Sequence, residues 1–228
     1  MSIASKLKST FRGKATDEQI LTEPDERENY PAAVAVDQPN QATMDFLRTT
    51  KCRMIAEVGI YQGHTSREIA RWLDGEGELH LYDFYDVTER VAGELRSAGH
   101  DNVREFPNSY KYLDSYNWSL AKTYEANPEP IYDYVFIDGA HTFAIDALAT
   151  VLADKLLKPG GYIDFDDYVW TLGGSPSLRP ERFELTGQMY TREQIDTKQV
   201  KMIVDLLIRR DDRYEEVVPD KIYRKVRA

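Results

Sequence analysis

The chain of 228 residues has the length of one large domain, or of one domain with short appendages. Its 29 Lys and Arg against 39 Asp and Glu give a net charge of -10, the opposite of the balance usual in nucleic-acid-binding proteins. No apolar run approaches the ~20 residues of a bilayer span, and the start lacks the apolar core of a signal peptide. A single cysteine, Cys52, excludes an internal disulfide. We therefore expect a cytoplasmic protein without nucleic-acid partners or stable membrane insertion.

The beginning of the chain differs from the remainder, because residues 1–14 carry basic side chains and no acid. We predict an N-terminal arm over residues 1–40 and one domain over residues 41–228. No internal repeat, low-complexity tract or linker divides that domain. A basic arm and a hairpin at the edge of a sheet favour a homodimer.

Strand-like and helix-like segments alternate from about residue 40, which is typical of an open parallel sheet with helices on both faces. The predicted helices cover residues 41–50, 65–72, 88–98, 111–124, 143–157 and 191–209. The predicted strands cover residues 54–60, 78–84, 103–106, 132–138 and 162–167, followed by a hairpin at 214–218 and 221–226. We predict an α/β fold, a Rossmann-like, doubly wound and mostly parallel seven-stranded sheet with a C-terminal antiparallel hairpin.

Two finer expectations concern where elements begin and end. Thr88 is a plausible N-cap for the helix that starts there, and the KPGG sequence at 158–161 is expected to stop the preceding helix. Residues 170–190 are rich in Gly, Pro, Ser and aromatic side chains without a clear period, so we predict a substrate loop or lid. Candidates to grip a substrate flank or lie within this loop, namely Tyr168, Trp170, Arg179 and Tyr190.

A glycine-containing turn follows the first strand, in the segment EVGIYQGHTS at 57–66. Gly59 and Gly63 let the backbone approach a ligand at the start of a helix. The incomplete glycine pattern disfavours a dinucleotide, and Glu57 suits a cationic group better than a pyrophosphate. Asp83 ends the next strand, where a carboxylate could accept both hydroxyls of a ribose. Each feature alone is as readily structural, but together they favour an adenosyl ligand.

Three carboxylates follow later strands of the predicted sheet. Asp138 ends the fourth strand, and Asp166 and Asp167 end the fifth. Because neighbouring parallel strands end in one crevice, these acids should converge there and require either raised pKa values or a cation. Oxygen ligands of this kind suit Mg²⁺. The alternative is that Asp166 and Asp167 cap a loop or pair with Arg179 or Arg182.

These segments, together with YDYVFIDGAH and LKPGGYIDFDDY, resemble class I S-adenosylmethionine-dependent methyltransferases over roughly residues 41–169. More narrowly, the chain is similar to the macrocin O-methyltransferase group of sugar methyltransferases, which has cephalosporin hydroxylase-like relatives. The resemblance implies S-adenosylmethionine (SAM) as cofactor and a sugar or glycan as acceptor. Actinobacterial methylmannose polysaccharide O-methyltransferases are one candidate subgroup, by general resemblance to a short chain in which we expect no added N-terminal domain.

The resemblance also implies roles for individual residues. It places the methionine end of SAM near Glu57, Gly59, Gly63 and Ser66, the ribose at Asp83 and the adenine near Asn108 and Ser109, with Asp138 also lining the cofactor. The spacing of Asp138 and Asp166 resembles the metal ligands of catechol O-methyltransferases, with Asp167 in place of their asparagine.

His141 is the candidate general base, with Asp138 as the second catalytic candidate. Catechol enzymes carry a lysine base at this offset, and a histidine is better suited to neutral pH. Some macrocin-group enzymes instead have an aspartate at the position near Ala140. This chain differs from them there, so their catalytic base cannot be assigned directly to this chain. The alternative role for His141 is to cap the helix that starts near Thr142.

The resulting hypothesis is a Mg²⁺-dependent O-methyltransferase that moves a methyl group from SAM to a hydroxyl of a small-molecule or oligosaccharide acceptor. A catechol or other vicinal-diol O-methyltransferase is the nearest alternative. A non-catalytic adenosyl-binding protein and an NAD-dependent oxidoreductase are alternatives of other classes.

Overall fold

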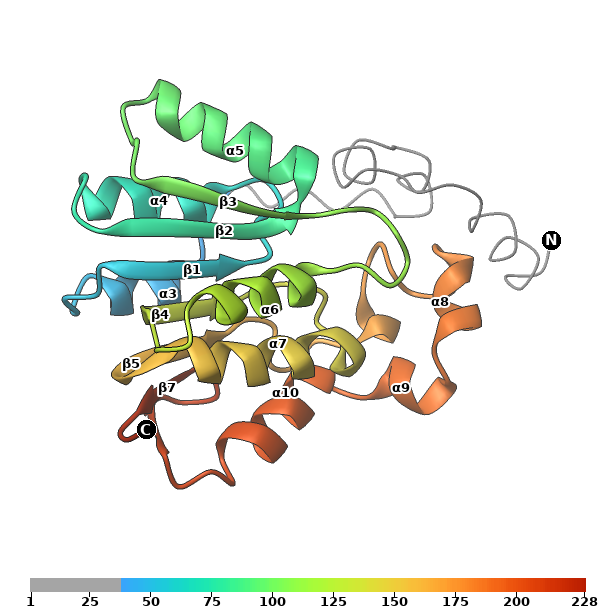
Figure 1. The fold of residues 1–228 in the computed structure, drawn as a ribbon. Helices are drawn as coiled ribbons and strands as arrows, with labels where there is room; N and C mark the ends of the chain where they lie inside the picture. Colours follow the sequence, from blue (N-terminus) through green and yellow to red (C-terminus); the bar gives the residue numbers. More distant parts are fainter. Residues whose placement is uncertain (1–37) are drawn as a thin grey trace.

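The computed structural model describes residues 38–228, so nearly all of the predicted N-terminal arm lies outside the described residues. Five parallel strands are, in chain order, β1 (Met54–Val58), β2 (Glu78–Phe84), β3 (Val103–Asn108), β4 (Tyr132–Ile137) and β5 (Leu157–Phe165). Two antiparallel strands, β6 (Tyr214–Val218) and β7 (Ile222–Lys225), continue the sheet beside β5. The strand order is β3-β2-β1-β4-β5-β7-β6, which confirms the predicted seven-stranded fold (Figure 1).

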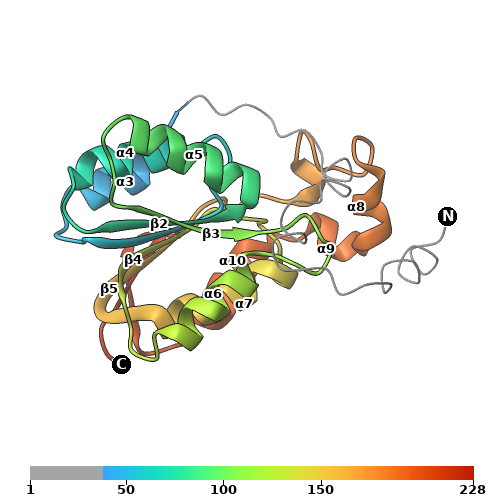
Figure 2. The same ribbon diagram turned by 45° about the horizontal axis from the view of Figure 1, so that its top comes forward.

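Helices cover both faces of the sheet, as Figure 2 shows. One face carries α3 (Gln41–Leu47), α4 (His64–Leu73) and α5 (Tyr85–Ser97). The opposite face carries α6 (Tyr116–Ala126), α7 (Phe143–Leu156), α10 (Gln199–Ile203) and the π-helical turn η3 (Val204–Ile208). None of the described helices combines the length and the apolar character needed to cross a membrane.

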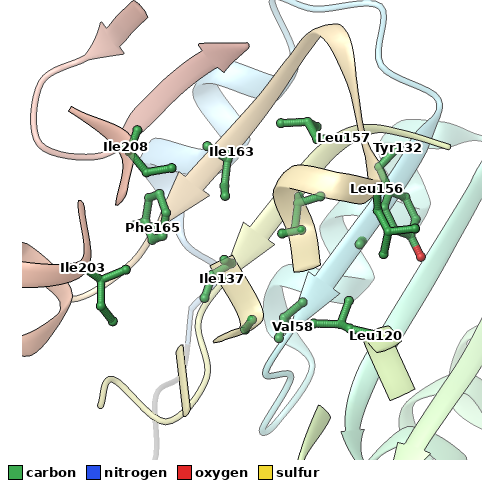
Figure 3. Packing of buried hydrophobic residues seen from close by; sticks show 14 of the residues in the cluster. Val58, Leu120, Tyr132, Ile137, Leu156, Leu157, Ile163, Phe165, Ile203 and Ile208 are labelled. Atoms are coloured by element: carbon green, nitrogen blue, oxygen red, sulfur yellow. The ribbon is translucent and has the colours of Figure 1, made fainter. Parts of the chain in front are cut away.

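Alternate residues of the central strands divide the core into two clusters. Ala56 and Val58 of β1 pack with α6 and α7. Ile55, the neighbour of Ala56 in the same strand, points to the opposite face and packs with α3 and α4. This period of two places apolar side chains on both faces, as expected for a sheet covered on both sides. Figure 3 shows the first cluster, in which side chains from β4, β5, α6 and η3 meet.

The structure corrects two predicted boundaries. Helix α5 begins at Tyr85 after Phe84, so Thr88 is not its N-cap. Thr88 is buried in the first turn, and its hydroxyl donates to the carbonyl of Tyr85 at 3.0 Å. The KPGG sequence at 158–161 does follow a helix, but it already belongs to β5 and contains the irregularity in the pairing with β4.

The helical pattern predicted over residues 191–209 is confirmed in part, because the segment is helical but divided into α9 (Arg192–Asp196), α10 and η3. Thr191 closes a capping box with Gln194, and this local bonding starts a separate short helix. The predicted substrate loop contains a 3₁₀ turn, η2 (Leu172–Gly174), and α8 (Glu184–Met189). Figure 1 places α8 and α9 beyond the end of the sheet at which the parallel strands finish.

The turn after β1 lies directly against the end of β4. Gly59 has φ = +87°, and a Cβ atom added there would lie 2.0 Å from the carbonyl oxygen of Asp138. The N–H of Gly59 donates to Tyr82 O at 2.8 Å, which fixes the same turn to β2. The three central strands therefore require glycine at this position, both for its backbone conformation and for space.

We expect Gly59→Ala to destabilise the protein far more than Gly75→Ala. Gly75 has φ = +82°, but no atom lies within 4 Å of its added Cβ. Both variants should lose about 1–2 kcal/mol from the left-handed backbone, and Gly59→Ala should lose at least about 2 kcal/mol more from overlap with Asp138. Urea unfolding measures both free energies, and equal losses would contradict the close approach.

Candidate active site

The carboxyl ends of β1, β4 and β5 meet at one edge of the sheet, where the strand order reverses between β1 and β4. The register pairs Val58 with Ile137, and Ile137 with Phe165. The N–H of Asp138 donates to Val58 O at 2.8 Å, and the N–H of Asp166 donates to Ile137 O at 3.0 Å. This edge therefore brings together the predicted glycine turn and both acidic segments.

The glycine turn leads directly into α4. Gly63 is the N-cap of α4 with φ = +79°, and a Cβ added there would lie 2.7 Å from a methyl group of Val91. The turn is thus packed tightly against α5. Since α4 follows β1, its amino end and its free N–H groups lie at the same edge as Asp138.

Glu57 is a buried carboxylate, and no basic side chain within the described part of the chain forms an ion pair with it. It is 1% exposed, and Glu57 Oε2 and Ser66 Oγ are buried atoms without a hydrogen-bond partner among the described residues. Burial raises the pKa of Glu57 to about 8, although the neighbouring Ser66 opposes the shift. A buried acceptor without a partner is costly, so this position fits a ligand with a cationic group such as the ammonium of SAM.

Asp83 shapes the glycine turn from the end of β2. Its Oδ2 accepts the N–H groups of Ile60 and Tyr61 at 2.7 and 3.1 Å, and its Oδ1 accepts that of Phe84 at 2.7 Å. Burial nevertheless raises its pKa. A carboxylate has about four acceptor positions, so three are used and one is available to a ribose hydroxyl.

The predicted adenine contacts behave differently from one another. The Oγ and N–H of Ser109 both donate to Asp114 Oδ2, at 2.6 and 2.7 Å, so Ser109 stabilises the turn after β3. Asn108 is buried, its Nδ2 donates to Ser109 O, and its Oδ1 has no partner among the described residues. Asn108 therefore keeps an acceptor that suits an exocyclic amine, and with Glu57 it makes this edge fit SAM.

The three predicted acidic residues lie close enough to affect one another's charge. Desolvation raises the pKa of Asp138, and Asp166, Asp167 and Glu57 raise it further. Burial likewise raises the pKa of Asp167, which His141 opposes. Like charges in one crevice favour the protonated forms or an added cation.

The predicted Mg²⁺ site is not assembled as a metal centre. Within residues 38–228, no three His, Cys, Asp or Glu side chains form a group that could hold a metal ion. The oxygen donors at Asp138, Asp166 and Asp167 have the chemistry that a hard divalent cation prefers.

Two residues that sequence reasoning did not single out engage Asp166. Asn40, the N-cap of α3, donates from Nδ2 to Asp166 Oδ1 at 2.8 Å. Lys221, directly before the hairpin strand β7, places Nζ 3.6 Å from the same oxygen and 3.0 Å from Asp164 Oδ1. As an alternative to metal binding, the sequence suggested that Asp166 pairs with Arg179 or Arg182. Asp166 does have an ion-pair partner, but that partner is Lys221.

His141 lies between the two acidic segments. Its Nε2 is 3.7 Å from Asp138 Oδ1 and 3.4 Å from Asp167 Oδ2. Its ring centroid is 5.4 Å from that of Trp170, so an aromatic face borders the same site. His141 precedes Thr142, the N-cap of α7, and its side chain points to the acids, which favours a chemical role over helix capping.

Tyr168, another candidate to grip a substrate, faces away from His141. Tyr168 is turned toward the C-terminal elements, where its hydroxyl bonds with Arg209 and lies 3.4 Å from Asp205 Oδ1. Arg209 also pairs with Glu216, so this contact anchors the segment after Asp167 to the hairpin. Tyr168 is therefore a structural residue in this arrangement.

Comparison with known proteins agrees with this geometry. Residues 56–168 match the family described as a methyltransferase domain. No curated protein sequence matches the chain. The domain match supports a methyltransferase, and it favours methyl transfer over the oxidoreductase alternative.

Solved structures share the fold over nearly the whole chain. The O-methyltransferase TomG from Streptomyces achromogenes, involved in tomaymycin synthesis and in complex with SAM, is 21% identical with a TM-score of 0.57, covering 97% of this chain and 95% of that chain. An O-methyltransferase from Bacillus cereus, in complex with S-adenosylhomocysteine (SAH), is 16% identical with a TM-score of 0.51, covering 96% and 94%. The fold is thus that of class I SAM-dependent O-methyltransferases, and the findings support that activity.

We expect the affinity for SAH to rise with pH up to about 8 and then to level off. The pKa of Glu57 is about 8 in the free protein. An ammonium group stabilises the carboxylate, so binding below that pH releases a proton and weakens by up to about tenfold per pH unit. Calorimetry between pH 6 and 9 measures this. Glu57→Gln should flatten the profile, and an unchanged slope in that variant would remove Glu57 from the cofactor site.

We expect Lys221→Met to destabilise the protein by about 3 kcal/mol or more, because it leaves a charge unpaired at Asp164, which is 0% exposed. Lys158→Met is the matched control. Lys158 pairs with Asp133 at 2.8 Å, where the side chains remain 40% and 27% exposed, so its loss should cost less than about 1 kcal/mol. Urea unfolding compares the two variants, and equal small losses would contradict the buried pair.

Proposed function

We propose that this methyltransferase moves the methyl group of SAM to a hydroxyl of a sugar or glycan, with His141 as general base. The observation that carries the proposal is the position of His141, whose Nε2 faces Asp138 and Asp167 at the edge where the cofactor-binding turn ends. An imidazole there can take the proton of an acceptor hydroxyl as the methyl group is transferred.

The protein's own residues would bind and orient both reactants. Glu57 would hold the ammonium of SAM, Asp83 a ribose hydroxyl and Asn108 the adenine. Asp138 and Asp167 would stabilise the imidazolium that forms when His141 accepts the proton. Methyl transfer needs a near-linear approach of the hydroxyl oxygen, so this positioning contributes substantially to the rate.

We also propose a divalent cation, Mg²⁺, held by Asp138, Asp166 and Asp167. When bound, it would orient the acceptor and lower the pKa of its hydroxyl. The proposal is supported by the like charges around Asp138, which raise the pKa of that residue, and by the oxygen-only donor set. It requires Asp166 to offer its second oxygen, because Oδ1 is bonded to Asn40.

The acceptor class is inferred from Trp170. Its ring lies 5.4 Å from the His141 ring, on the segment that leads into η2. The apolar face of a sugar ring can pack on an aromatic side chain while its hydroxyls face the acids and the imidazole. A catechol could use the same surface, so a vicinal diol on an aromatic ring is the competing acceptor.

Transfer of labelled methyl from SAM to a panel of oligosaccharides and catechols, with Mg²⁺ or with EDTA, tests the proposal. We expect transfer to a sugar that EDTA abolishes. Transfer to a sugar that continues in EDTA would contradict the proposed divalent cation and still support the sugar acceptor. Transfer only to catechols would favour the competing acceptor, and SAH binding with no transfer to any acceptor would favour a non-catalytic adenosyl-binding protein.

A further inference from the structure

The turn that carries His141 has an unusual backbone. His141 has φ = +55°, a left-handed conformation that a residue with a side chain rarely adopts. Such a conformation persists only where the surrounding contacts favour it over the alternatives. The turn runs from Asp138 at the end of β4 to Thr142 at the start of α7, so the side chain of His141 depends on how these few residues are held.

A tyrosine hydroxyl from α6 holds this turn. The N–H of Ala140 donates to Tyr116 Oη at 2.9 Å. Gly139 lies against the same oxygen, since a Cβ added to Gly139 would be 2.2 Å from it. Tyr116 is 7% exposed and belongs to the core cluster between the sheet and α7. The backbone of Gly139 and Ala140 therefore packs directly on the hydroxyl of Tyr116, and a side chain at Gly139 would not fit between them.

Tyr116 is itself fixed by a buried acid in the first turn of α7. Its hydroxyl donates to Asp146 Oδ1, and Asp146 is 2% exposed. Burial raises the pKa of Asp146, whereas His141, Tyr116 and the backbone amides of Ala140 and His141 act in the opposite direction. Asp146 therefore also lies beside the turn. The hydroxyl, with its proton directed at Asp146, presents a lone pair to Ala140.

We propose that Tyr116, anchored by Asp146, is a positioning residue that holds His141 in its orientation toward Asp138 and Asp167. This inference rests on the proposed role of His141 as general base. A base acts efficiently only when its ring is held within a fraction of an ångström of the productive position, by contacts that fix its backbone and its rotamer. Tyr116 supplies such a contact without touching the reacting atoms.

The proposal predicts that Tyr116 acts on the reaction only through His141. Tyr116→Phe keeps the buried ring and removes the hydroxyl. We expect its kcat to fall by up to about 100-fold, with the SAH dissociation constant unchanged within about twofold. His141→Ala should lower kcat by about 10²–10⁴-fold. The double variant should be no slower than His141→Ala alone, because the misplaced group is already absent.

Tyr82→Phe is the matched control. Tyr82 is another buried tyrosine of the same cluster, and its hydroxyl bonds with Thr123 and Tyr132 and not with the turn. It should lose stability much as Tyr116→Phe does, with kcat unchanged. A fall in kcat common to both tyrosine variants would indicate a general effect of lost core hydrogen bonds and overturn the proposal.

A readout without turnover completes the test. In NMR spectra of protein with ¹³C-labelled histidine, the ring signals of His141 should shift or broaden in Tyr116→Phe, while those of His100 stay in place. Unchanged His141 signals, or losses that multiply in the double variant, would overturn the positioning role. An unchanged kcat in His141→Ala would instead refute the general base itself, so the two failures are distinguishable.

Discussion

The close approach of the Gly59 and Asp138 backbones is the constraint on which the rest of the site depends. Because no side chain lies between these backbones, β1 and β4 pair up to their last residues. Glu57, Asp138 and the start of α4 therefore lie close together at one edge of the sheet. The fold alone would bring these strand ends near one another. The glycine contact brings the backbones of the two strand ends together at this edge.

The second determinant is electrostatic. Five carboxyl groups, Glu57, Asp138, Asp164, Asp166 and Asp167, follow or belong to three adjacent strands, and one lysine from the hairpin contacts two of them. Burial and mutual repulsion raise the pKa values of several of these groups. Such a site favours cationic ligands over anionic ones. The sulfonium and ammonium groups of SAM match that preference better than the phosphates of a dinucleotide do.

Sequence patterns predicted the parts of this structure that depend on local periodicity. Apolar runs such as 132–138 identify buried strands, and residues at strand ends identify the edge where the site lies. The same patterns did not show how the helical segment 191–209 is divided, where a capping box at Thr191 starts a separate helix and a π-helical turn changes the period. They failed at Thr88 because a helix can begin on an aromatic residue when tertiary packing favours it.

The residues that sequence patterns missed act over long separations in the chain. Asn40, Tyr116 and Lys221 are ordinary residues of a cap, a helix and a hairpin when they are considered one at a time. They gain a role only because the folded chain places them beside Asp166 or the turn at Gly139. No local motif encodes such contacts, so a single sequence cannot show them.

The position of Lys221 in the chain has a consequence for how the protein is made. Domains acquire structure from the N-terminal side as they are synthesised. The acidic residues of β1, β4 and β5 therefore all emerge before the lysine that neutralises Asp164. Until β7 pairs with β5, that carboxyl group lacks the one basic partner that it has within residues 38–228, and it retains its proton or its water more readily than in the finished sheet. The last strands thus complete the charge balance of the site as well as the sheet.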